Sequence, residues 1–274
     1  MLLPWRDSVR IFIGPRQVVM LRLSGSIKKR IVAKQILDCD SSSQINPWQA
    51  AFLALQEALR HSQWRDANAH VTLSNHFVHY ALIPWNEDVV SEKERAAYLR
   101  HHFDFAYESG SKNWDLRVSY GGFNGKSLAS GIDRTLLDEL RALFAQTSLR
   151  LASISPYLMS AYNHGRHAIG MRQAWFVLIE RGVLCLALLN HGQWQSMRSM
   201  PVESDWVDHL ETLLARESVL AGLNVNEVPI YLSWPEKPDT QPVINTKAKI
   251  HQISNTPRFS RLMAIPASYR LALW

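Results

Sequence analysis

The strongest constraint on the fold is a strand, strand, strand, helix order near the start of the chain. Val9–Ile13 and Gln17–Leu23 are apolar, β-branched runs on either side of a turn at 14–16, which predicts a β-hairpin. A third strand is expected at Ile27–Leu37 and a helix at Trp48–Arg60. Three antiparallel strands before the first crossover are uncommon, so this order narrows the choice of folds.

The same order begins again in the second half of the chain. Trp175–Glu180 and Val183–Leu189 predict a second hairpin, and Gln193–Val202 predicts a third strand. A helix is expected at Asp205–Leu220. Because an internal repeat constrains a fold more than an isolated motif does, we predict a duplicated α/β architecture.

The repeat predicts two domains, a first over residues 1–165 and a second, shortened one over residues 166–274. A small α/β unit is expected as an insertion in the first domain, at about 77–132. Within it, the capping box Ser91-Glu-Lys-Glu94 opens a helix, and Trp114–Ile132 forms a hairpin.

Helix ends and the C-terminus give three further expectations. Asn46-Pro47 should begin the first helix, because Asn is a favoured N-cap and Pro a favoured first helical residue. Asp133 should cap the helix that follows the insertion. Arg258–Trp274 is expected to form a short helix followed by an extended tail.

Composition and charge exclude several classes of protein. Of 274 residues, 47% are apolar and 20% charged, which is typical of a packed globular chain. The net charge of +6 is diffuse, and the basic run Lys28-Lys29-Arg30 lies at a strand start, so a solvated edge is favoured over a nucleic-acid or anionic-lipid patch. Cys39 and Cys185 cannot form a disulfide framework, which indicates a reducing compartment.

The location expected from the sequence is the cytoplasm. No apolar run reaches the roughly 18 residues of a spanning helix, and the N-terminus lacks a signal-peptide pattern. We therefore expect a chain that is peripheral at a membrane through a partner.

Short motifs spread over residues 8–233 carry a family resemblance. They are Ile13-Gly14 followed by Val18–Leu21, the turn Leu82–Glu87, the helical residues Arg100–Phe103, and the Trp206…Leu210…Leu214…Glu217 helix. With the repeat and the insertion, they resemble the actin-like (ribonuclease H-like, ASKHA) fold. Within it, they are similar to the PilM family of type IV pilus assembly and to its type II secretion relatives, the GspL family.

The resemblance implies a partner and a binding groove. In that family an inner-membrane assembly protein offers a short N-terminal cytoplasmic peptide to a groove between the first sheet and the inserted unit. By this resemblance Trp85 and Phe123 are expected to line a partner groove.

The chain departs from the nucleotide-binding members of the fold at both phosphate hairpins. Those members carry an Asp before the first glycine turn, where a carboxylate orients the metal and its water while N–H groups cradle phosphate. Here Phe12 stands at that position, and the turn Gly14-Pro15-Arg16 has lost one N–H to proline. The second hairpin, Glu180-Arg181-Gly182, keeps a carboxylate but lacks the hydroxyl residues that should follow. We expect no ATP hydrolysis; weak nucleotide binding through Arg16 or Arg181 is the alternative.

Other catalytic patterns are incomplete. His76 and His79, three apart on a strand, would point to opposite faces, and the adjacent His101 and His102 would not converge on a helix. The Gly-x-Ser-x-Gly pattern of a nucleophile elbow does not occur. We therefore expect no catalytic residues, no metal site and no cofactor.

The function expected from these observations is a non-catalytic scaffold, a pseudo-ATPase that binds a peptide of an inner-membrane pilus or secretion protein and binds no nucleic acid. Self-association into a homo-oligomer stays open. The rival hypothesis is an ATP-binding or sugar-kinase-like enzyme, since fold does not fix function. A third is an α/β protein with an unrelated small-molecule site.

Overall fold

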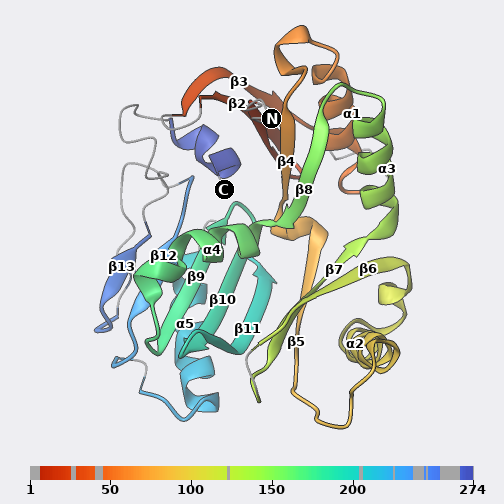
Figure 1. Cartoon of the computed structure of the whole chain (residues 1–274). Coiled ribbons are helices and arrows are strands. Elements are labelled where there is room, and N and C mark those ends of the chain that lie inside the picture. Colours follow the sequence, from red (N-terminus) through yellow and green to blue (C-terminus); the bar gives the residue numbers. More distant parts are fainter. Residues whose placement is uncertain are drawn as a thin grey trace. The chain divides into compact units, whose positions relative to one another are not determined.

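The computed structural model describes most of the chain in two compact units (Figure 1). The described residues are 7–25, 29–40, 46–121, 124–203, 206–224, 226–236, 244, 246–253 and 266–273. Unit 1 comprises 1–78, 133–160 and 255–274, and unit 2 comprises 79–132 and 161–254. The inserted segment is thus grouped with the second sheet. The domain boundary predicted at residue 165, which separates the two copies of the sequence repeat, stays a prediction.

Unit 1 is built on a five-stranded sheet in the order β3-β2-β1-β4-β8. Its strands are β1 (Ser8–Ile13), β2 (Gln17–Ser24), β3 (Arg30–Asp38), β4 (Asn68–Leu73) and β8 (Arg150–Pro156). Strands β1, β2 and β3 are antiparallel, and β4 and β8 continue the sheet in parallel from β1. Its helices are α1 (Gln49–Ala58), η1 (Ser62–Trp64), η2 (Asn75–Phe77) and α3 (Arg134–Ala145). The predicted hairpin, third strand and first helix are confirmed.

The C-terminal segment corrects one expectation. Residues Ala267–Leu273 form the 3-10 helix η5 and not an extended tail. Leu271, Ala272 and Leu273 are buried, and η5 contacts β1 and β2. Burial of this apolar run stabilises the helix. The expected short helix at the start of this segment lies outside the described residues.

Helix starts agree with the sequence in two cases and differ in one. In the capping box, the Ser91 Oγ accepts from the Glu94 N–H at 3.2 Å, and Glu94 accepts from the Ser91 N–H at 2.9 Å. Asp133 accepts from the Thr135 N–H at 2.8 Å, as predicted for α3. The cap predicted at Asn46 is wrong: Trp48 occupies the N-cap position, buried and edge-on to the Phe52 ring. Apolar packing at Trp48 sets this helix start in place of a polar cap.

Unit 2 contains a second five-stranded sheet, in the order β11-β10-β9-β12-β13. Its strands are β9 (Ala174–Glu180), β10 (Val183–Asn190), β11 (Gln193–Pro201), β12 (Ile230–Ser233) and β13 (Ile250–Gln252). Strands β9, β10 and β11 are antiparallel, and β12 and β13 follow in parallel from β9. This is the pattern of the first sheet, so the predicted duplication is confirmed. Helix α5 (Trp206–Leu220) packs on the sheet through a core that includes Trp206, Leu210 and Leu214.

Helix α4 (Tyr157–Ile169) connects the two halves of the chain. It ends before Gly170, whose φ of +64° is the left-handed conformation typical of a residue after a helix. Among the described residues, no helix combines the length and apolar character needed to cross a bilayer.

The insertion is a three-stranded sheet in the order β5-β7-β6 with one long helix. Its elements are β5 (Val78–Ile83), α2 (Glu92–Tyr107), η3 (Glu108–Asn113), β6 (Trp114–Ser119) and β7 (Ser127–Asp133). Ile83, Phe103 and Ala129 form its buried core, and the His79 ring stacks on Trp114 with centroids 3.9 Å apart. This core makes the insertion a small packed layer of its own.

Candidate functional site

The first hairpin buries an aromatic ring at the position where the family resemblance predicts the carboxylate of nucleotide-binding members. Phe12 on β1 is 1% exposed, and its ring meets the Tyr157 ring edge-on with centroids 5.5 Å apart. The turn closes through a hydrogen bond from the Gly14 N–H to the Gln17 carbonyl at 2.9 Å. A Cβ built on Gly14 would lie 2.9 Å from Phe12 Cε1. The glycine therefore leaves room for the Phe12 ring, and the hairpin is packed shut by apolar atoms.

The second hairpin has kept a carboxylate, Glu180, but a backbone N–H of its turn is already bonded to another acidic side chain of this protein. Glu180 ends β9 and is buried, and Gly182 in the turn has a φ of +87°. The Arg181 N–H, one of the turn donors that could face a phosphate, donates to Glu236 Oε2 at 3.3 Å. An acidic side chain of the chain itself thus lies where a bound anion would be expected.

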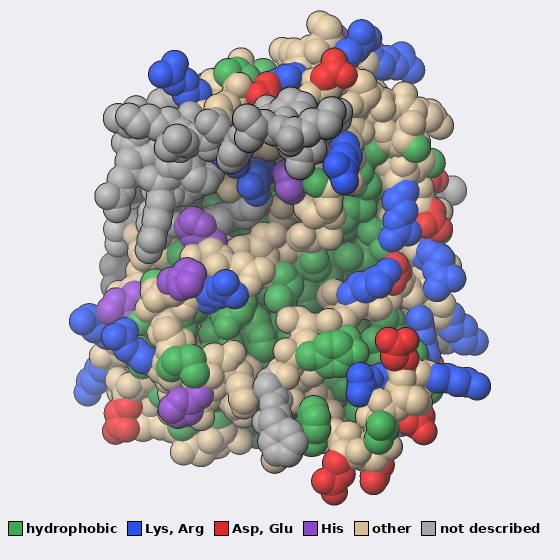
Figure 2. Space-filling view, in the orientation of Figure 1, with side chains coloured by type: hydrophobic (Ala, Val, Ile, Leu, Met, Phe, Trp, Pro, Cys, Tyr) green, Lys and Arg blue, Asp and Glu red, His purple; other side chains and the backbone are tan. Residues whose placement is uncertain are grey.

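Side chains that could bind a metal do not gather elsewhere in the part of the chain that the structure describes. No group of three or more His, Cys, Asp or Glu side chains in the described ranges could hold an ion. Burial raises the pKa of the Cys185 thiol to about 12, so this cysteine stays a neutral core thiol near pH 7. Basic side chains are spread over the face drawn in Figure 2 and do not form one patch.

The two groove residues expected from the family resemblance are not brought together by any contact that can be described. Trp85 lies on the loop after β5 and is 47% exposed. Phe123 lies outside the described residues. Their role at a partner groove stays a prediction.

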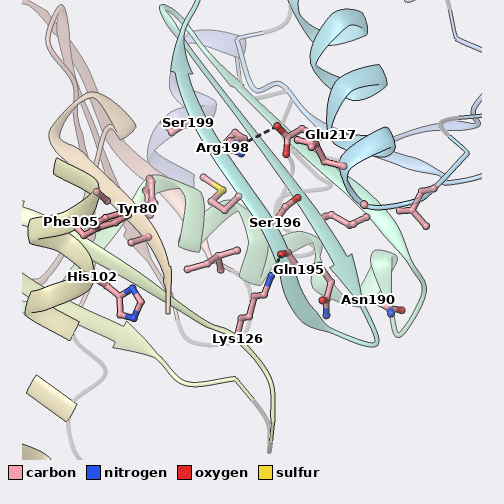
Figure 3. Close-up of a pocket in the computed structure, with 18 of the residues that line it drawn as sticks. Tyr80, His102, Phe105, Lys126, Asn190, Gln195, Ser196, Arg198, Ser199 and Glu217 are labelled. Atoms are coloured by element: carbon pink, nitrogen blue, oxygen red, sulfur yellow. Dashed lines mark hydrogen bonds and ion pairs between the residues drawn. The ribbon is translucent and has the colours of Figure 1, made fainter. Parts of the chain in front are cut away.

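A cavity of about 790 Å³ lies within unit 2, between the insertion and the second sheet (Figure 3). On the insertion side it is lined by Tyr80, Ala81 and Leu82 of β5 and by residues of α2 that include His102 and Phe105. On the other side it is lined by β11, the ends of β10 and α5, and Gln173. This volume is within the roughly 300–1,000 Å³ of ordinary ligand pockets.

The lining of this cavity shows that it follows the edge of a strand. Residues Gln195–Ser199 are consecutive on β11, and all five line the cavity. Successive side chains of a strand point to opposite faces, so a cavity that meets them all must run along the strand's edge. Strand β11 is the terminal strand of its sheet, and β5 is a terminal strand of the inserted sheet. We call this cavity, with its two strand edges, the edge groove.

One outward backbone group of β11 is already bonded by a side chain from the insertion. The register of β11 shifts between Trp194 and Ser196, so Gln195 is the extra residue of a β-bulge. Its carbonyl accepts a hydrogen bond from Lys126 Nζ at 2.8 Å. Figure 3 shows Lys126 reaching from the insertion to this strand. The bond marks a backbone acceptor on β11 that a donor from outside the sheet can reach.

The charges at the edge groove are mostly positive. Glu217 on α5 is buried and accepts from Arg198 Nε at 3.1 Å and from Arg216 Nη2 at 3.0 Å. Among the described residues that line the cavity it is the one acid, and they also include Lys126 and Arg198. The local excess of cations favours an anionic ligand.

Two apolar side chains stand open at the same groove. Phe105 on α2 is 85% exposed and Leu220 at the end of α5 is 69% exposed, and both line the cavity. Exposed large apolar side chains beside main-chain and cationic groups are suited to holding a polypeptide segment. This groove is not predicted from the sequence, because strand order in a sheet cannot be read from the strands themselves.

Two sheets with one shared strand pattern, joined to a small antiparallel insertion, define the actin-like ATPase fold. The sequence itself matches no protein-family model and no curated protein. A protein of this fold and of unknown function from Bacteroides thetaiotaomicron has a similar structure, with a TM-score of 0.57 and 9% identity over 83% of this chain and 82% of that one.

Two further solved structures match as well. The PilM–PilN type IV pilus biogenesis complex has a TM-score of 0.57 and 12% identity, over 84% of this chain and 81% of that one. The cytoplasmic domain of EpsL, an inner membrane component of the type II secretion system of Vibrio cholerae, has a TM-score of 0.57 and 13% identity, over 97% and 92%. The predicted fold and the predicted likeness to PilM and to the secretion relatives are confirmed at the level of structure.

Proposed function

We propose that this chain is a non-catalytic scaffold of a pilus or secretion assembly platform, which binds a short segment of an inner-membrane partner on the cytoplasmic side. The observation that carries the proposal is Phe12, buried against Tyr157 at the position of the expected carboxylate. A hydrolytic site on this fold needs an acid there to orient the metal and its water.

The second hairpin supports the same proposal. Glu236 accepts from the Arg181 N–H, so a phosphate at this turn would have to displace an internal carboxylate. Two anions at one N–H would repel each other, which weakens any nucleotide affinity of this turn. The buried Phe12 in the first hairpin and the Glu236 carboxylate at the second are thus two independent features that disfavour a phosphate site.

The similar structures support the choice of partner. PilM has been solved as a PilM–PilN pilus biogenesis complex, and EpsL is an inner membrane component of a secretion system. By analogy, this chain would bind a segment of a comparable membrane protein and would be peripheral at the inner membrane through it.

The rival function is an ATP-binding or sugar-kinase-like enzyme on the same fold. One observation favours it: Glu180 is buried at the end of β9, where such an enzyme would use a carboxylate. With Phe12 in the other hairpin, this acid has no counterpart from β1, and we propose the scaffold.

Phosphate release from ATP and Mg²⁺ tests the proposal. The purified chain and its Glu180→Gln variant should release phosphate at the same background rate, because the first hairpin has no acid to act together with Glu180. Release by the unmodified chain that disappears in Glu180→Gln, with both proteins folded by thermal melting, would contradict the scaffold and support the enzyme.

A further inference from the structure

The edge groove of unit 2 combines features that fit one kind of ligand. Its long wall is β11, a terminal strand whose residues Gln195–Ser199 are all half-buried or exposed. A terminal strand presents a row of backbone N–H and C=O groups that can pair with a further strand. The nine residues of β11 are enough to pair with an extended segment along most of its length.

The bond between Lys126 and Gln195 supports this use of the strand. An ammonium group takes the place at the Gln195 carbonyl that a backbone N–H of an added strand could take. Lys126 is itself exposed, so it can leave this carbonyl and pair with a carboxylate of the incoming segment. The bond therefore satisfies the Gln195 carbonyl in the absence of a partner and can be replaced when a further strand binds.

The side chains around the groove define the chemistry of the segment. Lys126 and Arg198 line it, and Glu217, the single acid among its described lining residues, is shared between Arg198 and Arg216. The charges left over are positive, which favours a segment with acidic side chains. Phe105 and Leu220 offer open apolar contacts for its other face.

We propose that β11 receives an extended, acidic segment of the partner as an added β-strand, with Phe105 as its apolar anchor. This inference rests on the proposed scaffold function and names its binding surface. Backbone pairing would supply affinity, and the alternation of acidic and apolar side chains would supply specificity.

The test uses the full chain and synthetic peptides of the length of β11, nine residues. The probe is an acetylated, amidated peptide of alternating glutamate and valine, fluorescently labelled and titrated by anisotropy. A peptide of alternating lysine and valine controls for charge. Two further copies of the probe are N-methylated at alternate backbone nitrogens, one copy at odd and the other at even positions.

The expected result is saturable binding of the acidic peptide and at least about fivefold weaker binding of the basic one. One N-methylated copy should lose binding and the other should keep it, because alternate backbone groups of a strand face its partner. Hydrogen exchange of the amides in Gln195–Ser199 should slow when the peptide is bound.

Two variants localise the binding. Phe105→Ala should weaken binding by at least about tenfold, as expected for an exposed anchor residue. Val90→Ala is the matched control: it removes an apolar side chain of the same insertion that is 70% exposed and does not line the groove. It should leave the affinity unchanged.

Three results would overturn the inference. They are equal binding of acidic and basic peptides, binding that neither N-methylated copy changes, and protection of β11 through dimerisation of the chain with no effect of the peptide. None of these results concerns phosphate release, so the scaffold function would stand or fall separately.

Discussion

The two hairpins that open the two sheets share a strand pattern and differ in the feature by which we propose that each has lost phosphate binding. In the first, the acid position holds Phe12, which is part of the core of unit 1. In the second, Glu180 remains, and Glu236 bonds the turn. At the first hairpin the change is a buried ring, Phe12, that packs in the core, whereas at the second hairpin it is a single hydrogen bond from the turn to the partly exposed Glu236. This difference predicts that mutations at the two hairpins will have effects of very different size.

The largest effect is expected at Phe12. Phe12→Ala should lower the free energy of unfolding by about 3–5 kcal/mol, because it removes a buried ring and leaves a cavity against Tyr157. Urea denaturation measures the change. The exposed Phe105→Ala is the control and should stay within about 0.5 kcal/mol. Equal losses for both variants would show that Phe12 is not a core residue.

A smaller effect is expected at Gly14. Gly14→Ala should cost about 1–3 kcal/mol, because the new methyl group would lie 2.9 Å from Phe12 Cε1 and displace the ring. Gly110→Ala is the matched control, since nothing lies within 4 Å of its Cβ position. The loss at Gly14 should shrink in a Phe12→Leu background, measured as a double-mutant cycle. An unchanged loss there would contradict the proposed contact.

At the second hairpin the expected effect is small. Glu236→Ala should change the free energy of unfolding by at most about 1 kcal/mol, because it removes a hydrogen bond at an exposed turn. The same denaturation experiment measures it. If this variant binds ATP with Mg²⁺ and the unmodified chain does not, Glu236 is the group that closes the second hairpin. If Glu236→Ala lowers the free energy of unfolding as much as Phe12→Ala does, the two hairpins do not differ in the way proposed.

The smallest expected effect is a difference in reactivity between the two cysteines. Cys39, whose N–H donates to the Arg16 carbonyl beside the first hairpin, is partly exposed, and Cys185 on β10 is fully buried. Burial raises the pKa of both thiols, that of Cys185 to about 12.

Thiol labelling of the native protein between pH 7 and 9 should therefore modify Cys39 slowly, faster as the pH rises, and leave Cys185 unmodified. Mass spectrometry after proteolysis measures both sites, and both should react in denaturant. As pH rises past the ordinary cysteine pKa, the unfolded state loses a proton that folded Cys185 keeps, so stability falls with pH. Native labelling of Cys185 at pH 8 would contradict its burial.

Much of the fold could be predicted from the sequence because its signals are local. The hairpin turns at Gly14-Pro15 and Arg181-Gly182 and the capping box at Ser91 each lie within a few residues, and each appears in the structure as expected. The start of α1 and the C-terminal η5 were mispredicted, because tertiary packing of Trp48 and of Leu271 decides them.

The edge groove could not be predicted from the sequence for the same reason. Its walls come from two sheets, and its clearest contact joins Lys126 to Gln195 across 69 positions of the chain. Which strand ends a sheet depends on strand order, and no side chain on β11 encodes it. By contrast, the absence of an acid at Phe12 could be read from the sequence, because the resemblance to the actin-like fold indicates where its nucleotide-binding members carry an Asp.

The most direct test of the pseudo-ATPase account is a calorimetric titration of the purified chain with ATP and Mg²⁺, with thermal melting in parallel. We expect no heat of binding and an unchanged melting temperature at millimolar nucleotide. Magnesium-dependent binding with a raised melting temperature would contradict it, because a ligand that binds only the folded state stabilises it, by an amount that grows with the logarithm of ligand concentration over Kd.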